Sequence, residues 1–129
     1  MRILIVDDSR SMRLILKRML AEMGHDEVAE AEDGSVALAQ MEAFRPELAL
    51  VDWNMPVMDG LTATRAIRAG EGPNHDTPIV VLSASARSED HAAGLDAGAD
   101  AYLNKPIDFA ALAKVMNRVG GGRTAIRAL

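Results

Sequence analysis

The sequence predicts an α/β fold, a doubly wound five-stranded parallel sheet with helices on both faces. Short runs rich in β-branched residues alternate along the chain with longer segments of helical periodicity. Several of the short runs are almost continuously apolar, as expected for strands covered on both sides. Five such strand–helix pairs fit into the 129 residues, and right-handed crossovers should connect them.

The strands are expected where these apolar runs lie. Polar residues or loop signals follow each of them. The five ranges are Arg2–Val6, Glu27–Ala31, Glu47–Val51, Pro78–Leu82 and Ala101–Leu103.

Helical spacing and capping residues predict five helices. Ser9 is the expected N-cap of the first, and Gly24 lies just beyond its end. Its apolar stripe is Met12, Ile15, Leu16, Met19, Leu20 and Met23. The second helix carries Ala37, Leu38, Met41 and Phe44 before Pro46.

The remaining three helices are predicted from similar signals. The third starts near Leu61 and stops in the polar loop 70–74, and the fourth spans about Ser88 to Ala97. Asp108 is the expected N-cap of the fifth. The apolar stripe of this last helix is Phe109, Leu112, Met116 and Val119.

Composition excludes several kinds of protein. The chain has no cysteine, which rules out disulfides, thiolate chemistry and a cysteine-built zinc site. Nineteen acidic residues against 14 basic ones give a net charge of −5, which disfavours direct nucleic-acid binding. The apolar runs are much shorter than the roughly 20 residues of a membrane-spanning helix. No signal-peptide pattern follows Met1, so we expect a cytoplasmic domain without membrane insertion.

The residues at the ends of the predicted strands are the candidates for function. In open α/β sheets, ligands bind outside the carboxyl ends of the strands, where Asp7, Asp8, Asp52, Ser83 and Lys105 should meet. Each residue by itself is typical of a cap or a loop. Three neighbouring carboxylates, however, repel one another unless a cation or a proton compensates them. Mg²⁺ is a suitable cation because it prefers carboxylate oxygens and retained waters.

A metal held by carboxylates beside a lysine is the outline of a phosphate site, because both cations neutralise phosphoryl oxygens. Asp52 is then a candidate nucleophile, since carboxylates can form aspartyl-phosphate intermediates. Ser83 could donate a hydrogen bond to the resulting phosphoryl group.

Four separated motifs resemble those of two-component response-regulator receiver domains, and especially single-domain chemotaxis receivers. The resemblance covers about residues 2 to 119, in order and with the family's spacing. It implies a flavodoxin-like sheet with strand order 2-1-3-4-5. The motifs are Ile3–Asp8, Asp52–Gly60, Val81–Ala84 and Gly98–Pro106.

The resemblance also implies roles for the site residues. Asp52 would accept a phosphoryl group from a histidine of a sensor kinase or a histidine phosphotransfer protein. Asp8 and Asp52 would bind Mg²⁺ through their side chains, Asn54 through its backbone carbonyl, and Asp7 mostly through a water. Lys105 would contact the acyl phosphate, and the bond between Lys105 and Pro106 would be cis.

The resemblance further implies a switch. Ser83 would move toward the phosphoryl group, and the Tyr102 ring would turn into the space that it leaves. The face made by the fourth helix, the fifth strand and the fifth helix would then change shape and bind a partner protein. Residues expected to flank the pocket are Trp53, Ala84, Ser85 and Pro106.

Several residues also have ordinary interpretations. Tyr102 could be a half-buried strand aromatic, and Asp59-Gly60 is typical of a turn that starts a helix. The three histidines, His25, His75 and His91, are expected on the solvated surface. Arg10, Arg13 and Lys17 form either a solvated helix face or a docking patch for the phosphodonor.

We expect a receiver domain over residues 1–119 and a Gly-rich flexible tail or truncated linker over 120–129. The chain would act as a stand-alone receiver, a monomer or weak phosphorylation-dependent dimer, whose only chemistry is its own phosphorylation and dephosphorylation. One alternative is the receiver of a larger response regulator or hybrid kinase. A small Mg²⁺-dependent aspartyl-phosphate phosphatase is a second alternative. Asn54 disfavours it, because such phosphatases commonly carry an acid two residues after the nucleophile.

Overall fold

The computed structural model contains a five-stranded parallel sheet with the strand order β2-β1-β3-β4-β5, which confirms the predicted fold class. It describes residues 1–55, 58–70 and 73–128. Residues 56–57 of the second motif, 71–72 of the polar loop and 129 of the tail lie outside the described residues. The strands are β1 (Arg2–Val6), β2 (Glu27–Ala31), β3 (Leu48–Asp52), β4 (Ile79–Ser83) and β5 (Ala101–Asn104).

Strands β3 and β4 each begin and end one residue later than the sequence predicts. The parallel ladder between them pairs Ala49 with Ile79 at one end and Asp52 with Leu82 at the other. Asp52 and Ser83 are therefore the last residues of their strands rather than the first residues of the following loops. This register gives both side chains the fixed backbone of a buried strand.

Helices and short 3-10 turns connect and follow the strands. The α-helices are α1 (Arg10–Glu22), α2 (Gly34–Phe44), α3 (Gly60–Ala69), α4 (Ser88–Asp96), α5 (Phe109–Arg118) and α6 (Gly122–Arg127), and the 3-10 turns are Pro73–Asp76 and Val119–Gly121. Ser9, Asp33, Asp59 and Asp108 each accept a backbone N–H at the start of a helix.

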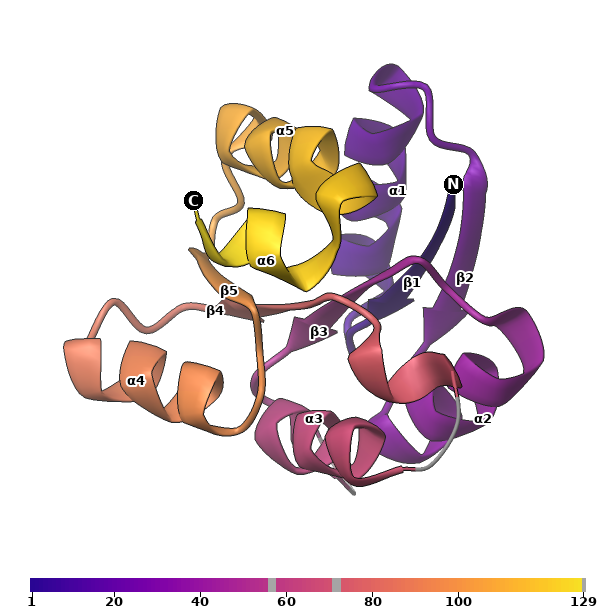
Figure 1. Ribbon diagram of the computed structural model, residues 1–129. Helices are drawn as coiled ribbons and strands as arrows, with labels where there is room; N and C mark the ends of the chain where they lie inside the picture. The colour runs from indigo at the N-terminus through magenta and orange to yellow at the C-terminus, as the bar shows by residue number, and fades with distance from the viewer. Residues whose placement is uncertain (56–57, 71–72, 129) are drawn as a thin grey trace.

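The two faces of the sheet bury separate apolar layers. Alternate residues of β1 divide between them, with Ile3 and Ile5 packing toward α1 and α5, and Leu4 and Val6 toward α2 and α3. Figure 1 shows α1, α5 and α6 on one side of the sheet and α2, α3 and α4 on the other. This double coverage explains why the strands are apolar at nearly every position.

The C-terminal residues differ from the predicted flexible tail, because residues 122–127 form α6. Ile126 is fully buried in the core layer that contains α1 and α5. The guanidinium groups of Arg123 and Arg127 donate to the buried carboxylate of Asp100 at 2.7 and 2.9 Å. One apolar anchor and two charged hydrogen bonds thus hold a segment whose glycines indicate a helix end. The role of this segment as a linker stays a prediction.

Two residues of the predicted apolar stripes lie toward solvent. Ile15 on α1 is 45% exposed, and Phe109 at the start of α5 is 41% exposed. In the described part of the chain, no helix has the length and apolar character needed to cross a bilayer.

Candidate functional site

The predicted site residues lie together at the carboxyl ends of the strands. Asp7 follows β1, Asp52 ends β3, and Lys105 follows β5. Backbone hydrogen bonds extend the ladder beyond the strands, from the Asp7 N–H to the Ala31 carbonyl at 3.0 Å and from the Lys105 N–H to the Ser83 carbonyl at 2.7 Å. The sheet therefore holds the backbone N–H group of each of these two residues.

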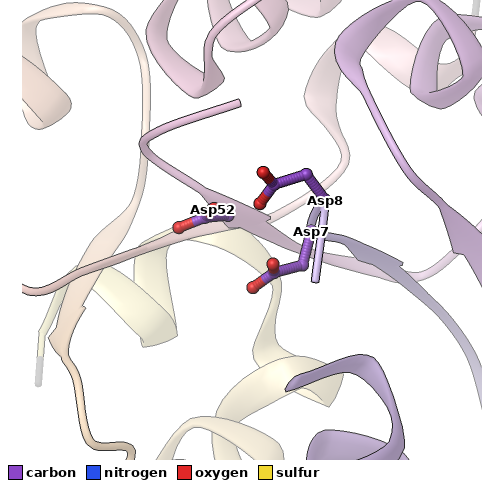
Figure 2. A group of neighbouring side chains, drawn as sticks. All are labelled: Asp7, Asp8 and Asp52. Carbon is purple, nitrogen blue, oxygen red and sulfur yellow. The ribbon is translucent and has the colours of Figure 1, made fainter. Parts of the chain in front are cut away.

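Three carboxylates form the centre of the site. One oxygen from each of Asp7, Asp8 and Asp52 lies within 4.8 Å of the others. Figure 2 shows these side chains extending into a common space from the ends of β1 and β3. Asp7 is fully buried and Asp52 is 5% exposed, whereas Asp8 lies at the solvent edge. The cluster is thus buried on one side and open on the other.

Lys105 places a positive charge in this cluster. Its Nζ donates to an Asp52 oxygen at 2.8 Å and to an Asp7 oxygen at 3.1 Å. Burial lowers the pKa of Lys105, but the hydrogen bonds and charges of Asp52 and Asp7 outweigh it and raise the pKa above its ordinary value. The ammonium therefore stays protonated between the two carboxylates.

Asp52 has a pKa above that of an ordinary aspartate. Burial is the largest cause, and the charges of Asp7 and Asp8 add to it, while the hydrogen bond and charge of Lys105 act in the opposite direction. Burial and the two neighbouring carboxylates together thus outweigh the effect of the Lys105 ammonium on this pKa.

The donor set fits a hard divalent cation. All three side chains offer carboxylate oxygens, and Mg²⁺ is bound by one or two carboxylates together with retained waters. A second cation beside Lys105 would offset the charges of Asp7 and Asp8, which add to the effect of burial on the pKa of Asp52. Asn54 lies exposed beyond β3, and its expected role through the backbone carbonyl stays a prediction.

Ser83 and Tyr102 are connected through the loop after β4. The buried Ser83 hydroxyl oxygen accepts the Ser85 N–H at 3.1 Å. The Ser85 carbonyl accepts the Tyr102 hydroxyl at 3.2 Å and also the side-chain amide of Asn104. A movement of the Ser83 hydroxyl would therefore break a hydrogen bond of the residue that holds the Tyr102 hydroxyl.

The Tyr102 ring is half-buried and packs between two other rings. Its centroid lies 5.9 Å from that of Trp53 in an edge arrangement and 3.8 Å from that of His91, against which it stacks. The expectation of a solvated His91 is wrong, because this ring is partly buried. Within the described residues its Nε2 is buried without a hydrogen-bond partner. Stacking across α4 and β5 could not be predicted from their sequences.

Other predicted residues surround the cluster. The Lys105–Pro106 peptide bond is cis, as the resemblance implies. Pro106 and Ala84 are exposed, and Trp53 and Ser85 are half-buried.

The Asp59-Gly60 pair starts α3, which confirms its ordinary interpretation, since the Asp59 carboxylate accepts the Thr62 N–H at 2.8 Å. Gly60 also has a packing role that the sequence analysis missed. A Cβ atom at this position would overlap the backbone carbonyl of Asp52. The glycine therefore lets α3 begin directly against the residue at the centre of the site.

Arg13 is a second residue whose contacts were missed. Its guanidinium donates to the backbone carbonyl of Asp7 at 2.6 Å and to the Glu30 carboxylate at 3.0 Å. Helical spacing places Arg13 on a charged face of α1, but it does not indicate that this side chain reaches the neighbouring loop and strand.

The doubly wound sheet carries its acidic side chains and a lysine at the carboxyl edge, which is where open α/β sheets bind their ligands. The model of the response regulator receiver domain matches residues 3–117 of this chain. The chain therefore belongs to the response regulator receiver family. Receivers of this family act in two-component signalling, where they bind Mg²⁺ and interact with histidine kinases or phosphotransfer proteins and with downstream targets.

Relatives include proteins of two different lengths. The chain is 37% identical over 125 residues to the chemotaxis protein CheY of Pseudomonas aeruginosa, covering 94% of this chain and 100% of that protein. It is 44% identical over 111 residues to the transcriptional regulatory protein PrrA of Mycobacterium tuberculosis, covering 86% of this chain but only 46% of PrrA. The chain thus spans about half the length of that regulator.

Solved structures of a chemotaxis protein and of a kinase receiver domain share the fold. The chemotaxis protein CheY4 of Vibrio cholerae matches with a TM-score of 0.82 and 35% identity, over 92% of this chain and 97% of that one. The receiver domain of the sensor histidine kinase PA1611 of Pseudomonas aeruginosa matches with a TM-score of 0.82 and 36% identity, over the same shares of the two chains. That structure has a magnesium ion in its active-site cleft.

Proposed function

We propose that this chain is a phosphorylation-controlled receiver that accepts a phosphoryl group on Asp52 and switches a protein-binding face. The observation that carries the proposal is the position of Asp52, almost buried between two further carboxylates and 2.8 Å from the Lys105 ammonium. A buried carboxylate at the end of a strand is a fixed nucleophile, and the adjacent cation is placed to neutralise the charge of an incoming phosphoryl group.

The phosphoryl transfer is a displacement at phosphorus. A carboxylate oxygen of Asp52 forms the new P–O bond while the P–N bond to the donor imidazole breaks, and the electron pair of that bond stays on the nitrogen. The donor is a histidine of a sensor kinase or of a histidine phosphotransfer protein. Hydrolysis of the acyl phosphate by water returns Asp52 to the carboxylate.

The same residues would hold Mg²⁺. Asp8 and Asp52 would bind it through their side chains, Asn54 through its backbone carbonyl, and Asp7 mainly through a water. When bound, Mg²⁺ neutralises negative charge on the phosphoryl oxygens. Lys105 supplies a second positive charge to the phosphoryl group, and the Ser83 hydroxyl supplies a hydrogen-bond donor.

The switch would use the connection from Ser83 through Ser85 to Tyr102. The acyl phosphate carries roughly −1.5 to −2 charges in place of the single charge of the carboxylate, and it presents three acceptor oxygens. If the Ser83 hydroxyl turns toward the phosphoryl group, its oxygen moves away from the Ser85 N–H that it now accepts, and the Ser85 backbone shifts in response. The Tyr102 hydroxyl then loses its partner, and the ring becomes free to turn inward.

The face that would respond lies around Tyr102. A groove of about 750 Å³ is bounded by α4, β5 and α5, with Ile126 and Arg127 of α6 at its edge. Tyr102 and His91 contribute to its lining, so a change of their stacking alters its shape. Binding of a downstream protein in this groove, including a chemotaxis-type partner, would couple phosphorylation to a signal.

A second candidate is supported by the lengths of the relatives. The chain covers all of a chemotaxis protein but 46% of a transcriptional regulator, so a receiver of this sequence could also act as one domain of a larger regulator or hybrid kinase. In that case α6 would lead into a linker. A cytoplasmic location is proposed for either form, as for homologous CheY proteins.

The test is exposure of the protein to a small acyl phosphate with and without Mg²⁺, followed by intact mass measurement. One phosphoryl adduct that needs Mg²⁺ is the expected result. Continuous turnover of small phosphate esters would instead indicate the phosphatase alternative.

A further inference from the structure

We propose that Arg13 is a positioning residue for the magnesium site. It does not contact the three carboxylates but holds the backbone carbonyl of Asp7. The inference rests on the proposed Mg²⁺ site and adds a residue that lies on α1 and touches none of the three carboxylates of that site. Its basis is the set of contacts around the loop between β1 and α1.

Asp7 is held by a hydrogen bond at every polar group. Its N–H donates to the Ala31 carbonyl at 3.0 Å. One carboxylate oxygen accepts the Ser9 N–H at 2.8 Å and the other accepts the Lys105 ammonium at 3.1 Å. The remaining group is the backbone carbonyl, and Arg13 donates to it at 2.6 Å. Arg13 therefore supplies the hydrogen bond that holds the carbonyl of this peptide unit.

The carbonyl of Asp7 belongs to the peptide bond that leads into Asp8. Asp8 lies at the solvent edge, and none of the hydrogen bonds of the described residues holds its side chain. The direction of the Asp8 carboxylate consequently depends on the backbone of the loop. Rotation of the Asp7–Asp8 peptide would carry one of the three carboxylates away from the other two.

Arg13 is itself anchored on the neighbouring strand. Its Nε donates to the Glu30 carboxylate at 3.0 Å, and its side chain is only 14% exposed. Glu30 precedes Ala31, whose carbonyl holds the Asp7 N–H. One guanidinium thus joins the start of α1, the end of β2 and the acidic loop, which is the β1–α1 loop that carries Asp7 and Asp8. This double contact requires the forked guanidinium of arginine, and a lysine ammonium does not reproduce it.

Lys17 provides a matched control on the same helix. Its Nζ binds the other oxygen of Glu30 at 3.2 Å, but Lys17 has no hydrogen bond to the acidic loop. Lys17→Gln therefore removes one positive charge and one contact to Glu30 while leaving Asp7 held. Arg10→Gln removes a further exposed charge near the site without breaking an ion pair of the described residues.

Charge and positioning predict opposite results for Arg13. A positive charge repels Mg²⁺, so an effect of charge alone would make Arg13→Gln bind Mg²⁺ more tightly. Loss of positioning would make it bind more weakly. Arg13→Lys separates the two fully, because the charge is retained while the double contact is lost.

The experiment is an Mg²⁺ titration of the wild-type protein and the four variants, measured by the fluorescence of Trp53, the one tryptophan, and by calorimetry. Thermal melting without Mg²⁺ verifies that each variant is folded. We expect Arg13→Lys and Arg13→Gln to raise the Kd on the order of fivefold, and Lys17→Gln and Arg10→Gln to leave it unchanged or lower it.

Equal Kd values for Arg13→Lys and the wild type would overturn the inference, as would tighter binding by Arg13→Gln. If Arg13→Gln fails to fold, Arg13→Lys decides alone, since it keeps the charge and most of the aliphatic stem. Absence of Mg²⁺ binding by the wild type would overturn the proposed metal site and this inference with it. A failure of Arg13 positioning alone leaves wild-type binding intact.

Discussion

The Lys105 ammonium lies 2.8 Å from a carboxylate oxygen of Asp52, although 53 positions separate the two residues in the chain. The contact joins the ends of β3 and β5, which are not neighbours in the sheet but are separated by β4. Lys105 therefore has two effects. It neutralises part of the acidic cluster, and it occupies one carboxylate oxygen of Asp52 and one of Asp7.

Replacing Lys105 by methionine should separate these effects. Without the ammonium, Mg²⁺ meets less repulsion and no competing hydrogen bonds, so we expect Lys105→Met to bind Mg²⁺ more tightly, on the order of tenfold. Phosphorylation from a small acyl phosphate should become slower, because one cation beside the phosphoryl group is lost. Trp53 fluorescence measures the first effect and intact mass the second.

Lys114→Met is the control for this change, because Lys114 is an exposed lysine on α5. It should alter neither measurement. Weaker Mg²⁺ binding by Lys105→Met would contradict the competition between the ammonium and the metal.

Stability without metal should depend on pH through Asp52. Its pKa is raised in the folded protein, so the folded state keeps this proton to a higher pH than the unfolded chain does. The free energy of unfolding then falls as the pH rises through the interval between the ordinary aspartate pKa and the raised pKa. Asp52→Asn removes this dependence.

In the presence of a chelator, Asp52→Asn should therefore be more stable than the wild type at pH 7. The difference should disappear below about pH 4, where Asp52 is protonated in both states. Urea unfolding across this range measures it. A wild-type protein that is more stable than Asp52→Asn at pH 7 would show that Lys105 compensates the cluster fully.

Tyr102 should report phosphorylation only when Ser83 is present. Tyr102 is the one tyrosine, so a fluorinated tyrosine gives a single NMR signal. We expect this signal to shift when an acyl phosphate and Mg²⁺ are added. The reason is that the Ser85 backbone shifts and the Tyr102 hydroxyl loses its acceptor, the Ser85 carbonyl. Ser83→Ala should still be phosphorylated but should show a reduced shift. Ser35→Ala, an exposed change on α2, is the control, and an unreduced shift in Ser83→Ala would contradict the connection.

The C-terminal helix should contribute measurably to stability. Ile126 is fully buried in the core layer beside α5, so Ile126→Ala is expected to cost about 2–4 kcal/mol in the free energy of unfolding. Leu14→Ala makes a similar truncation at a residue that is 47% exposed and should cost about 0.5 kcal/mol or less. Similar small values for both would indicate that α6 is not part of the core.

The sequence predicted the fold and the grouping of the site residues correctly where a local pattern was sufficient to determine them. Continuous apolar runs predicted strands covered on both faces, and the rule for the carboxyl ends of parallel strands predicted that Asp7, Asp52 and Lys105 meet. The ends of β3 and β4 were predicted one residue too early. The reason is that the cross-strand ladder, rather than the apolar run, determines where a strand ends.

The features that were missed depend on contacts between distant segments. The glycines at 120–122 predicted a flexible tail or linker after the fifth helix. Nothing in the local sequence indicated that Asp100 would bind the arginines of α6. The contacts of Arg13 with Asp7 and Glu30, and the stacking of His91 on Tyr102, likewise arise only when the elements pack. Such contacts involve side chains whose partners are chosen by the fold and not by neighbouring residues.

The most direct test of the central claim is to locate the phosphoryl group. The wild type, Asp52→Asn and Asp8→Asn would be treated with Mg²⁺ and a small acyl phosphate, and the adduct would be assigned by intact and peptide mass. We predict one adduct on the peptide that contains Asp52, none in Asp52→Asn, and a reduced yield on the same peptide in Asp8→Asn. An adduct that persists in Asp52→Asn, or that lies on another residue in the wild type, would contradict the claim.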